Sequence, residues 1–577
     1  MTIVAILIAI VLFLGLVFGL GLPWVAASRF DPIEKLALGA GAGVLQLYLF
    51  AGLVYVSGVS SPRVFAALPL LAAVAVALRF GAIRTLWRIP DVRGTLGRQL
   101  LFTAWCVGWL ALVHSYSGGE WSADWQEHYE RTLFFLDHRP LTTTFLGIYA
   151  LPARPPLANL VDGAALALTA RDFAHFQLFN TLFSTLCWLP AAALVRHFGR
   201  KRQPHVADAV LLLAIMLSPL VIQNATFAWT KLPATFFILL AVVFFVRGLG
   251  EEAPGRRIVA AVAAVAALLT HYSALPYVLL LGTAHLVFSW SRRHRRPVGA
   301  ELVAAGALAA GLAGTWFGWA VAHYGIAGTF QSSTTGAPSL PPGAWIACRL
   351  WNLFITFVPH PLRPTDYGFI AQTNPWGFAH DYFFTIYQTT LPGAFGAAGL
   401  VLWLWFARQR RTSGAPPAER WFWRGFVPGA ILLSIATAYW RDRWGVAHIG
   451  LSSVVLIGLA WLAARWEETP ARIRRFWAAA LVLDAALGLA LHFYLQHILH
   501  VSLRDLPALL RGQPIEFSAV SSKNLLLKQA LGYRFVGDDG PPALLVLAVL
   551  AGLIALAVRP VVAAARRANP SLADARC

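Results

Sequence analysis

The sequence predicts an all-α polytopic membrane protein with about 13–15 transmembrane helices, and three observations lead to this prediction. Of the 577 residues, 58% are hydrophobic and only 12% are charged, and the mean hydropathy is +0.63. Apolar runs that could cross about 30 Å of hydrocarbon recur along the whole chain. Basic residues gather at every second connection between these runs. This combination excludes a soluble enzyme with an ordinary polar surface.

The candidate spans follow one another from the first residues to near the end of the chain. They lie near residues 2–22, 36–57, 64–80, 99–115, 174–195, 207–222, 232–246, 258–270, 276–290, 301–323, 384–407, 424–439, 445–464, 475–494 and 542–558. Several runs are short, which gives the range in the number of helices. The first run has neither a basic segment before it nor a small-residue cleavage site, so we expect a retained span and not a signal peptide.

The net charge of +20 indicates membrane topology and not a nucleic-acid partner, because the basic residues lie in alternate short loops. By the positive-inside rule these loops face the cytoplasm. The three long connections, 116–173, 324–383 and 495–541, then face the outside. The same pattern places the N-terminus outside and the C-terminus inside.

These connections divide the chain into consecutive parts. We expect additional N-terminal transmembrane helices in 1–98, a catalytic transmembrane core in 99–323 that includes the first external loop, the second external loop in 324–383, C-terminal transmembrane helices in 384–494, the third external loop in 495–541, and a last transmembrane helix with a basic cytoplasmic tail in 542–577. We expect the external loops to carry short interfacial helices.

The first external loop contains the strongest functional motif, an acidic helix. Asp124, Glu127, His128 and Arg131 follow i, i+3, i+4 and i+7 spacing and therefore share one helix face. Carboxylates at this position can meet a membrane-bound substrate from the outer side. Burial beside Trp121 and Trp125 would raise their pKa values toward those of a general base. Asp124 and Glu127 are therefore the candidate catalytic residues, with His128 as a candidate substrate contact.

The opposite face of this helix is aromatic and aliphatic. It carries Trp125, Tyr129, Leu133 and Leu136. This division predicts a helix lying in the membrane interface, with the aromatic side in the headgroups and the ionisable side toward protein or water. Tyr129 is a further candidate substrate contact. The plainer alternative is an amphipathic surface helix whose charges are solvated.

A second motif in the same loop is Arg154-Pro155-Pro156-Leu157. The two prolines fix the backbone, so the arginine is presented from a rigid turn. A guanidinium at the interface suits a phosphate, because its planar fork can bind two oxygens. The alternative is an arginine that extends toward lipid headgroups.

A third signal is a set of cationic and polar residues at the outer ends of distant spans. Positive charge on this side runs against the positive-inside trend and indicates a local role. If the helices bring these groups together, they would clamp a donor phosphate opposite the acidic helix. The candidate phosphate ligands, besides Arg154, are Lys231, His271, Arg441 and Arg443, and the neighbouring candidate substrate contacts are Tyr272 and His448.

Taken together, the acidic helix, the Arg154-Pro155-Pro156-Leu157 turn and the sites around Lys231 and His271 resemble the GT-C superfamily of integral membrane glycosyltransferases. The likeness is to bacterial relatives of the protein O-mannosyltransferases and of the lipid A aminoarabinose transferase. It covers mainly residues 99–290. Two features depart from the family pattern: the two acids are three residues apart instead of adjacent, and about three spans precede the acidic loop where relatives usually have one.

The resemblance implies an inverting glycosyltransferase of the cell envelope that uses a polyprenyl-phosphate sugar. The acceptor would be a lipid, a glycan or a protein. The enzyme would lie in the bacterial inner membrane, among membrane lipids, with its active site facing the periplasm or the cell exterior. A divalent cation between carboxylates and phosphate would fit this chemistry, but the sequence shows no convincing ligand set for a metal.

Two other functions remain open at this stage. A lipid or solute transporter, or a flippase, would place ionisable residues near the middle of the bilayer, where Asp484 is the clearest acid. An enzyme like the O-antigen ligases or polymerases would instead rely on arginine and histidine in the loops after residue 324.

Overall fold

The computed structural model describes most of the chain. The described residues are 1–113, 124–145, 149–199, 204–251, 253–292, 298–332, 341–357, 421–437, 448–494 and 542–568, with isolated residues among 399–408 and at 497. Within these ranges the regular elements are helices, and Phe145 and Tyr149 form one isolated antiparallel bridge. The expected all-α architecture is confirmed.

The helices follow one another with short connections. In chain order they are α1 Ile3–Val25, α2 Pro32–Val56, η1 Pro62–Ala66, α3 Ala67–Leu78, α4 Phe80–Trp87, α5 Pro90–Ala111, α6 Asp124–Leu136, η3 Leu151–Ala153, α7 Leu157–Leu166, α8 Phe173–Thr185, α9 Trp188–Phe198, α10 Pro204–Met216, α11 Pro219–Thr226, α12 Lys231–Gly250, α13 Pro254–Thr270, η4 Tyr272–Ala274, α14 Leu275–Arg292, α15 Val298–Gly314, α16 Phe317–Phe330, α17 Pro342–Phe357, η6 Phe422–Phe426, α22 Val427–Thr437, α23 His448–Ala464, η7 Trp466–Glu468, α24 Ala471–Phe493 and α27 Ala543–Ala568.

Most of the predicted apolar runs lie in helices of the structure, but the described residues contain fewer clear spans than the 13–15 predicted for the whole chain. Among the described residues, seven helices are long and apolar enough to cross a membrane, and up to ten if each bent pair forms one span. The bent pairs are η1 and α3 with α4, α10 with α11, and α15 with α16, at angles of 77°, 66° and 64°. The predicted span at 384–407 lies almost wholly outside the described residues. The chain is therefore a multi-pass membrane protein.

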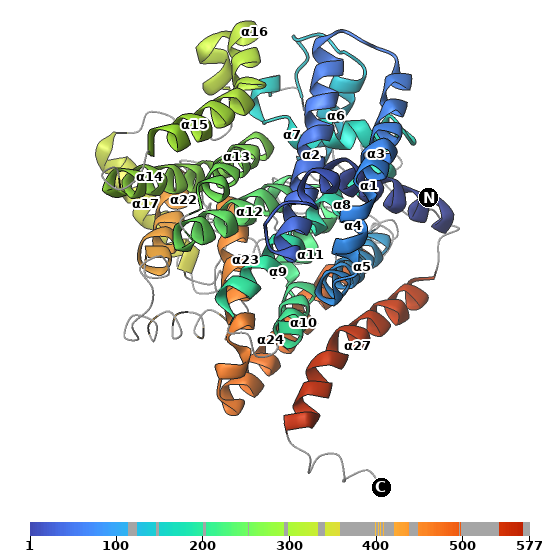
Figure 1. The fold of residues 1–577 in the computed structure, drawn as a ribbon, viewed down its shortest axis with the longest axis vertical. Coiled ribbons are helices and arrows are strands. Elements are labelled where there is room, and N and C mark those ends of the chain that lie inside the picture. Colours follow the sequence, from blue (N-terminus) through green and yellow to red (C-terminus); the bar gives the residue numbers. More distant parts are fainter. Residues whose placement is uncertain are drawn as a thin grey trace, which may run out of the picture.

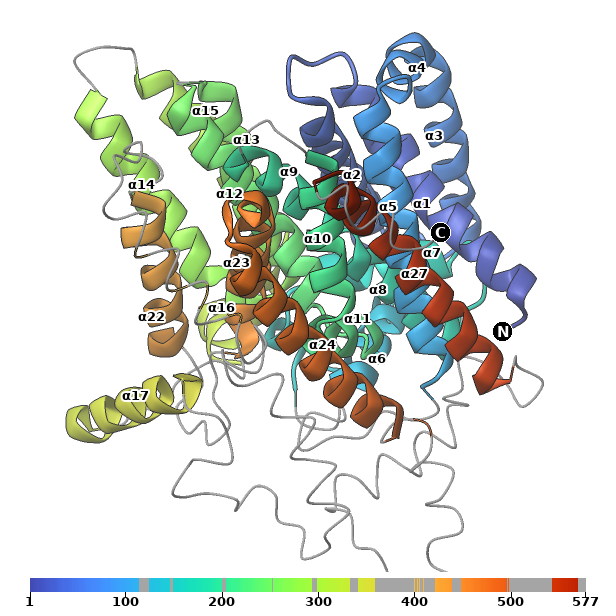
Figure 2. The ribbon, with the colours of Figure 1, turned by 90° about the horizontal axis from the view of Figure 1, so that it is seen from below.

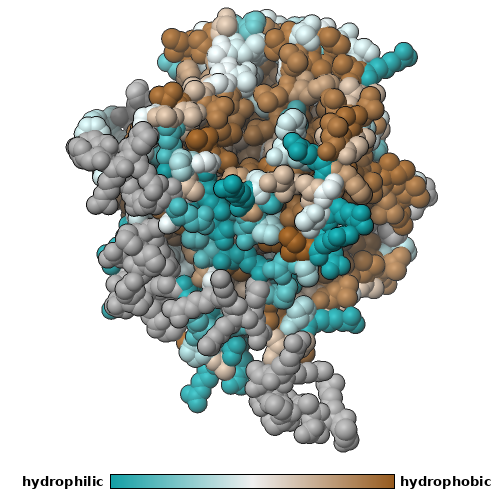
Figure 3. Space-filling view, viewed as in Figure 1, coloured by the Kyte–Doolittle hydropathy of each residue, from teal (hydrophilic) through white to brown (hydrophobic). Residues whose placement is uncertain are grey.

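The helices form one bundle with two distinct ends. Figure 2 shows α4 at one end of the bundle and α6 at the other. In Figure 1, α8, α9, α11 and α12 lie near the centre of the bundle. On the face shown in Figure 3, hydrophilic residues gather in the middle and hydrophobic residues form much of the outline. This is the pattern of a bundle whose apolar sides face lipid.

The N-terminal helices are part of this bundle and not a separate attachment. The backbones of α1 and α2 touch, because a Cβ atom added at Gly21 or Gly43 would overlap the backbone of the other helix. Glu34 on α2 is 1% exposed and pairs with Arg247 at 2.7 Å and with Arg256 at 2.5 Å. Since these arginines lie on α12 and α13, this buried network fastens α2 to the central helices.

Candidate active site

The acidic helix α6 forms as predicted, but its environment differs from the prediction. Glu127, His128 and Arg131 are 0%, 2% and 1% exposed. On the other face, Trp125 and Tyr129 pack edge-on against Phe173 of α8, with ring centroids 4.6 and 5.4 Å apart. The prediction of an interfacial helix with its aromatic side in the headgroups is therefore wrong. Because α7 and α8 cover α6, both of its faces lie inside protein.

Arg131 links α6 to the turn that follows it. Its guanidinium donates to Glu127 Oε1 at 2.9 Å, and it also donates to the carbonyl oxygens of Leu151 at 2.6 Å and Ala150 at 3.0 Å. The guanidinium carbon lies 4.2 Å from the centroid of the Phe145 ring. Arg131 thereby satisfies the carbonyl groups at the start of η3 and fixes this turn relative to the acids.

The arginine-proline turn lies against the acidic face of α6. Arg154 follows η3 in an extended conformation, and its Nη2 lies 3.4 Å from Glu127 Oε2 and 3.9 Å from Asp124 Oδ1. The Tyr272 hydroxyl donates to the carbonyl of Pro152 at 2.8 Å and holds the same turn from the side of η4. The structure thus brings together a basic group and both candidate catalytic acids.

The junction of α11 and α12 completes the cluster from a third part of the chain. Trp229 donates from Nε1 to Asp124 Oδ2 at 2.9 Å. The Lys231 ammonium lies 3.1 Å from the centroid of the Trp229 ring and is close enough to Asp124 to act on its charge. A cation over an indole face polarises the ring, which strengthens the N–H as a donor. Lys231 is 5% exposed, so its charge is only weakly screened by water.

The two acids differ in their electrostatics. Burial raises the pKa of Asp124 above its ordinary value, despite the opposing charges of Arg154 and Lys231. Burial acts in the same direction on Glu127, but Arg154 and Arg131 outweigh it and hold the pKa of that carboxyl below its ordinary value. Glu127 is therefore an ionised partner of two arginines. Asp124, whose side chain is 23% exposed, is the carboxylate better suited to accept a proton.

The other residues of α6 have different surroundings. Burial lowers the pKa of His128 to about 4, which makes it a neutral imidazole near pH 7. The amide of Asn159 on α7 donates to the His128 carbonyl at 2.7 Å and to the Thr132 hydroxyl at 3.1 Å, and so ties α7 to α6. The Tyr129 hydroxyl donates to the carbonyl of Arg171 at 2.8 Å. Tyr129 thus packs on the face of α6 opposite to the acids.

Four candidates from the sequence remain, namely His271, Arg441, Arg443 and His448. His271 connects α13 to η4, and its Nδ1 accepts from the backbone N–H of Ser273 at 3.1 Å. Arg441 and Arg443 lie outside the described residues. His448 begins α23.

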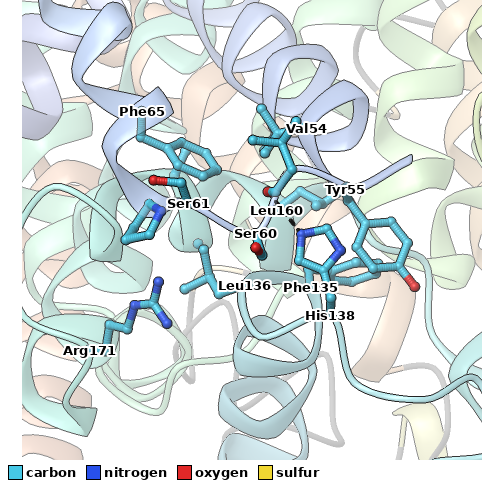
Figure 4. Close-up of a pocket in the computed structure, with 15 residues that line it drawn as sticks. Val54, Tyr55, Ser60, Ser61, Phe65, Phe135, Leu136, His138, Leu160 and Arg171 are labelled. Carbon is cyan, nitrogen blue, oxygen red and sulfur yellow. Dashed lines mark hydrogen bonds between the residues drawn. The ribbon is translucent and has the colours of Figure 1, made fainter. Parts of the chain in front are cut away.

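A crevice at the C-terminal end of α6 is too small for a substrate. Figure 4 shows it between the C-terminal end of α2, η1 and the end of α6, with Ser60, Ser61, His138 and Arg171 around apolar residues. The His138 Nε2 donates to the carbonyl of Val59 at 3.1 Å. Its volume of about 10 Å³ has room for roughly one water molecule.

Sequence reasoning overlooked two roles in the site. In the sequence, Trp229 was considered only as a neighbour of Lys231, and Arg131 only as one residue of the acidic face. The i, i+4 spacing of Glu127 and Arg131 signals their ion pair, but nothing in the sequence connects Trp229 with Asp124, 105 positions away. Among the described residues, no group of three His, Cys, Asp or Glu side chains could hold a metal ion.

Comparisons with known proteins give structural likeness without sequence similarity. No family model matches the chain, and no curated protein shows significant similarity to it. The fold is similar to the crystal structure of ArnT from Cupriavidus metallidurans bound to undecaprenyl phosphate, with a TM-score of 0.43, 15% identity, and coverage of 79% of this chain and 74% of that one. It is also similar to the arabinosyltransferase EmbB from Mycobacterium smegmatis, with a TM-score of 0.36, 15% identity, and coverage of 76% of this chain and 45% of that one. This likeness concerns the general layout of the helices, and no activity follows from it.

Proposed function

We propose that this protein is an inverting glycosyltransferase that moves a sugar from a polyprenyl-phosphate donor to an acceptor outside the cytoplasm. The observation behind the proposal is the meeting of Asp124 with Arg154 and Lys231, which three separate segments contribute. A partly exposed carboxylate beside two cations matches a reaction in which one group takes up a proton and a phosphate leaves.

In the proposed reaction, Asp124 accepts the proton of an acceptor hydroxyl while the hydroxyl oxygen attacks the anomeric carbon of the donor. The bond between that carbon and the phosphate oxygen breaks, and its electron pair leaves with the polyprenyl phosphate. Arg154 and Lys231 stabilise the charge that develops on the phosphate, an interaction that strengthens toward the transition state. A single displacement of this kind inverts the configuration at the anomeric carbon.

The supporting residues of the site make this geometry rigid. Glu127 and Arg131 anchor the arginine turn, and Trp229 fixes one carboxylate oxygen of Asp124. Such preorganisation is what a phosphate-leaving reaction needs, because the dipoles do not have to reorient during the reaction.

The proposal includes the location of the reaction. The bundle end that carries α6 is opposite the end that carries α4, which belongs to the arginine-rich connection predicted to be cytoplasmic. We therefore propose a bacterial inner-membrane enzyme whose site opens to the periplasm or cell exterior, with a lipid, glycan or protein as acceptor.

The experiment that tests the activity is transfer from a panel of radiolabelled polyprenyl-phosphate sugars by the purified protein in lipid nanodiscs. A membrane extract supplies the acceptors, and Arg154→Gln serves as the variant. Transfer by wild type with weakened donor capture by the variant supports the proposal. Donor binding without transfer across the whole panel would instead favour a flippase, and absence of donor binding would favour a solute transporter.

A further inference from the structure

The start of helix α12, next to the proposed catalytic acid, lacks the side-chain cap that a helix usually has. Thr230 is the N-cap residue, and its side chain makes no capping hydrogen bond. The residue is 1% exposed, and its hydroxyl is buried without a hydrogen-bond partner among the described residues. Buried hydroxyl groups are normally satisfied, so this one requires an explanation.

The sequence explains why Thr230 does not cap the helix. An N-cap threonine accepts a hydrogen bond from the backbone N–H two or three residues later. The third position of α12 is Pro233, which has no N–H. One of the two possible capping donors is therefore missing, and the hydroxyl remains available for a ligand.

The turn before α12 has a strained backbone. Ala228 has a φ of 59°, a left-handed conformation that is unfavourable for a residue with a Cβ atom. Such strain persists where the surroundings impose it and is concentrated at ligand sites. Here the strained turn directs Trp229 to Asp124 and places the start of α12 beside the acid.

The charges around this helix start favour an anion. The first N–H groups of a helix have no acceptor one turn earlier, and the helix dipole places partial positive charge there. Lys231, the first residue of α12, contributes a buried ammonium group. Arg154 reaches the same acid from the other side. Backbone N–H groups, an orphan hydroxyl and two cations are together the donor set of a phosphate site.

We infer that the N-terminus of α12 binds the phosphate group of the substrate, with the Thr230 hydroxyl as a direct ligand. The hydroxyl and the N–H of Leu232 donate to phosphate oxygens, and Lys231 and Arg154 neutralise the charge. Thr230 thereby becomes a specificity residue for a phosphate monoester or diester. The identity of the lipid attached to this phosphate rests on the proposed function, whereas the binding of a phosphate group does not.

The test compares three variants for binding of undecaprenyl phosphate in nanodiscs, measured by native mass spectrometry. Thr230→Val removes the hydroxyl at nearly constant volume, and Thr230→Ser keeps it. Ser218→Ala is the matched control, because Ser218 is also an uncapped N-cap residue with a buried, unpartnered hydroxyl, but lies at the far end of α11. Inorganic phosphate and phosphatidylglycerol are tested as competitors.

We expect Thr230→Val to weaken binding by about 10- to 100-fold, the weight of a hydrogen bond to a charged group, while Thr230→Ser and Ser218→Ala stay close to wild type. Thermal stability without ligand should not fall in Thr230→Val, because no hydrogen bond is lost. Competition by inorganic phosphate would identify the bare phosphate group as sufficient, and competition by neither probe would identify the prenyl-linked phosphate as the ligand.

A fourth variant, Pro233→Ala, tests the capping argument. It restores the missing N–H, so Thr230 can cap the helix, and we expect a more stable protein that binds undecaprenyl phosphate more weakly. Equal affinities for Thr230→Val and Ser218→Ala would overturn the inference even if the enzyme transfers sugar. A Thr230-dependent affinity in a protein that transfers no sugar would uphold the phosphate site and overturn the proposed activity.

Discussion

Replacement of Glu127 by glutamine separates the structural acid of the site from the reactive one. Glu127 is 0% exposed and lies between Arg131 and Arg154, whose side chains are 1% and 14% exposed. Glutamine has nearly the same shape but no charge, so two largely buried guanidiniums would lose their counter-charge. Removing one partner of a buried ion pair typically destabilises a protein by about 3–5 kcal/mol.

The assay is thermal unfolding of the purified protein in detergent, followed by intrinsic fluorescence. For a chain of 577 residues, a loss of this size corresponds to a decrease in the apparent Tm of roughly 2–4 °C. The matched control is Asp137→Asn, which removes an acid that also contacts two arginines, Arg139 and Arg171. Because those side chains are 35–37% exposed, the control should lose no more than about 1 kcal/mol.

Replacement of Asp124 provides a second comparison with Glu127→Gln. Asp124→Asn should change the apparent Tm little, because Asp124 is 23% exposed, lies 3.9 Å from Arg154, and keeps an oxygen for Trp229. If Glu127→Gln unfolds at the same temperature as Asp137→Asn, the buried network does not hold the arginine turn in place. The division of roles between the two acids would then be refuted.

Two further predictions follow from the pKa directions and from helix packing. The acidic limb of the kcat/KM profile should lie above the pH expected for an ordinary aspartate, because burial raises the pKa of Asp124. Since Arg154 lowers this pKa, the limb should move to higher pH in Arg154→Gln. A limb that stays in place would exclude Asp124 as the titrating base. Gly43→Ala should lower the apparent Tm, since the added Cβ would overlap the backbone at Val17 and overpacking costs about 1–3 kcal/mol. The control is Gly52→Ala on the same helix, whose Cβ would meet only ordinary contacts, so the apparent Tm should stay unchanged or rise.

Patterns within one segment were predicted well from the sequence. Most apolar runs lie in helices because 3.6-residue geometry and the thickness of hydrocarbon leave few alternatives, although three of the candidate spans among the described residues are bent helix pairs. The i, i+3, i+7 spacing correctly placed Asp124, Glu127 and Arg131 on one face of α6. Arg154 was expected to bind a phosphate, which stays a prediction, and its ion pairs with Asp124 and Glu127 were not predicted.

Relations between distant segments could not be read from the sequence. The amphipathic pattern of α6 is the same whether its aromatic face meets lipid headgroups or Phe173, so the interfacial placement failed. Glu34 and Arg256 are separated by 222 positions, and only the packed fold shows that α2 belongs to the core. Trp121 and Trp125 were expected beside Asp124, but Trp121 lies outside the described residues and Trp125 packs against Phe173. The tryptophan that contacts Asp124 in the structure is Trp229.

The most direct test of the central claim is a single-turnover measurement with a bound polyprenyl-phosphate sugar, wild type beside Asp124→Asn, in which donor binding and sugar transfer are recorded on the same sample. The account predicts unchanged donor binding and a rate of transfer lower by about 10²- to 10⁴-fold, the usual contribution of a general base. Transfer at the wild-type rate by Asp124→Asn would contradict it.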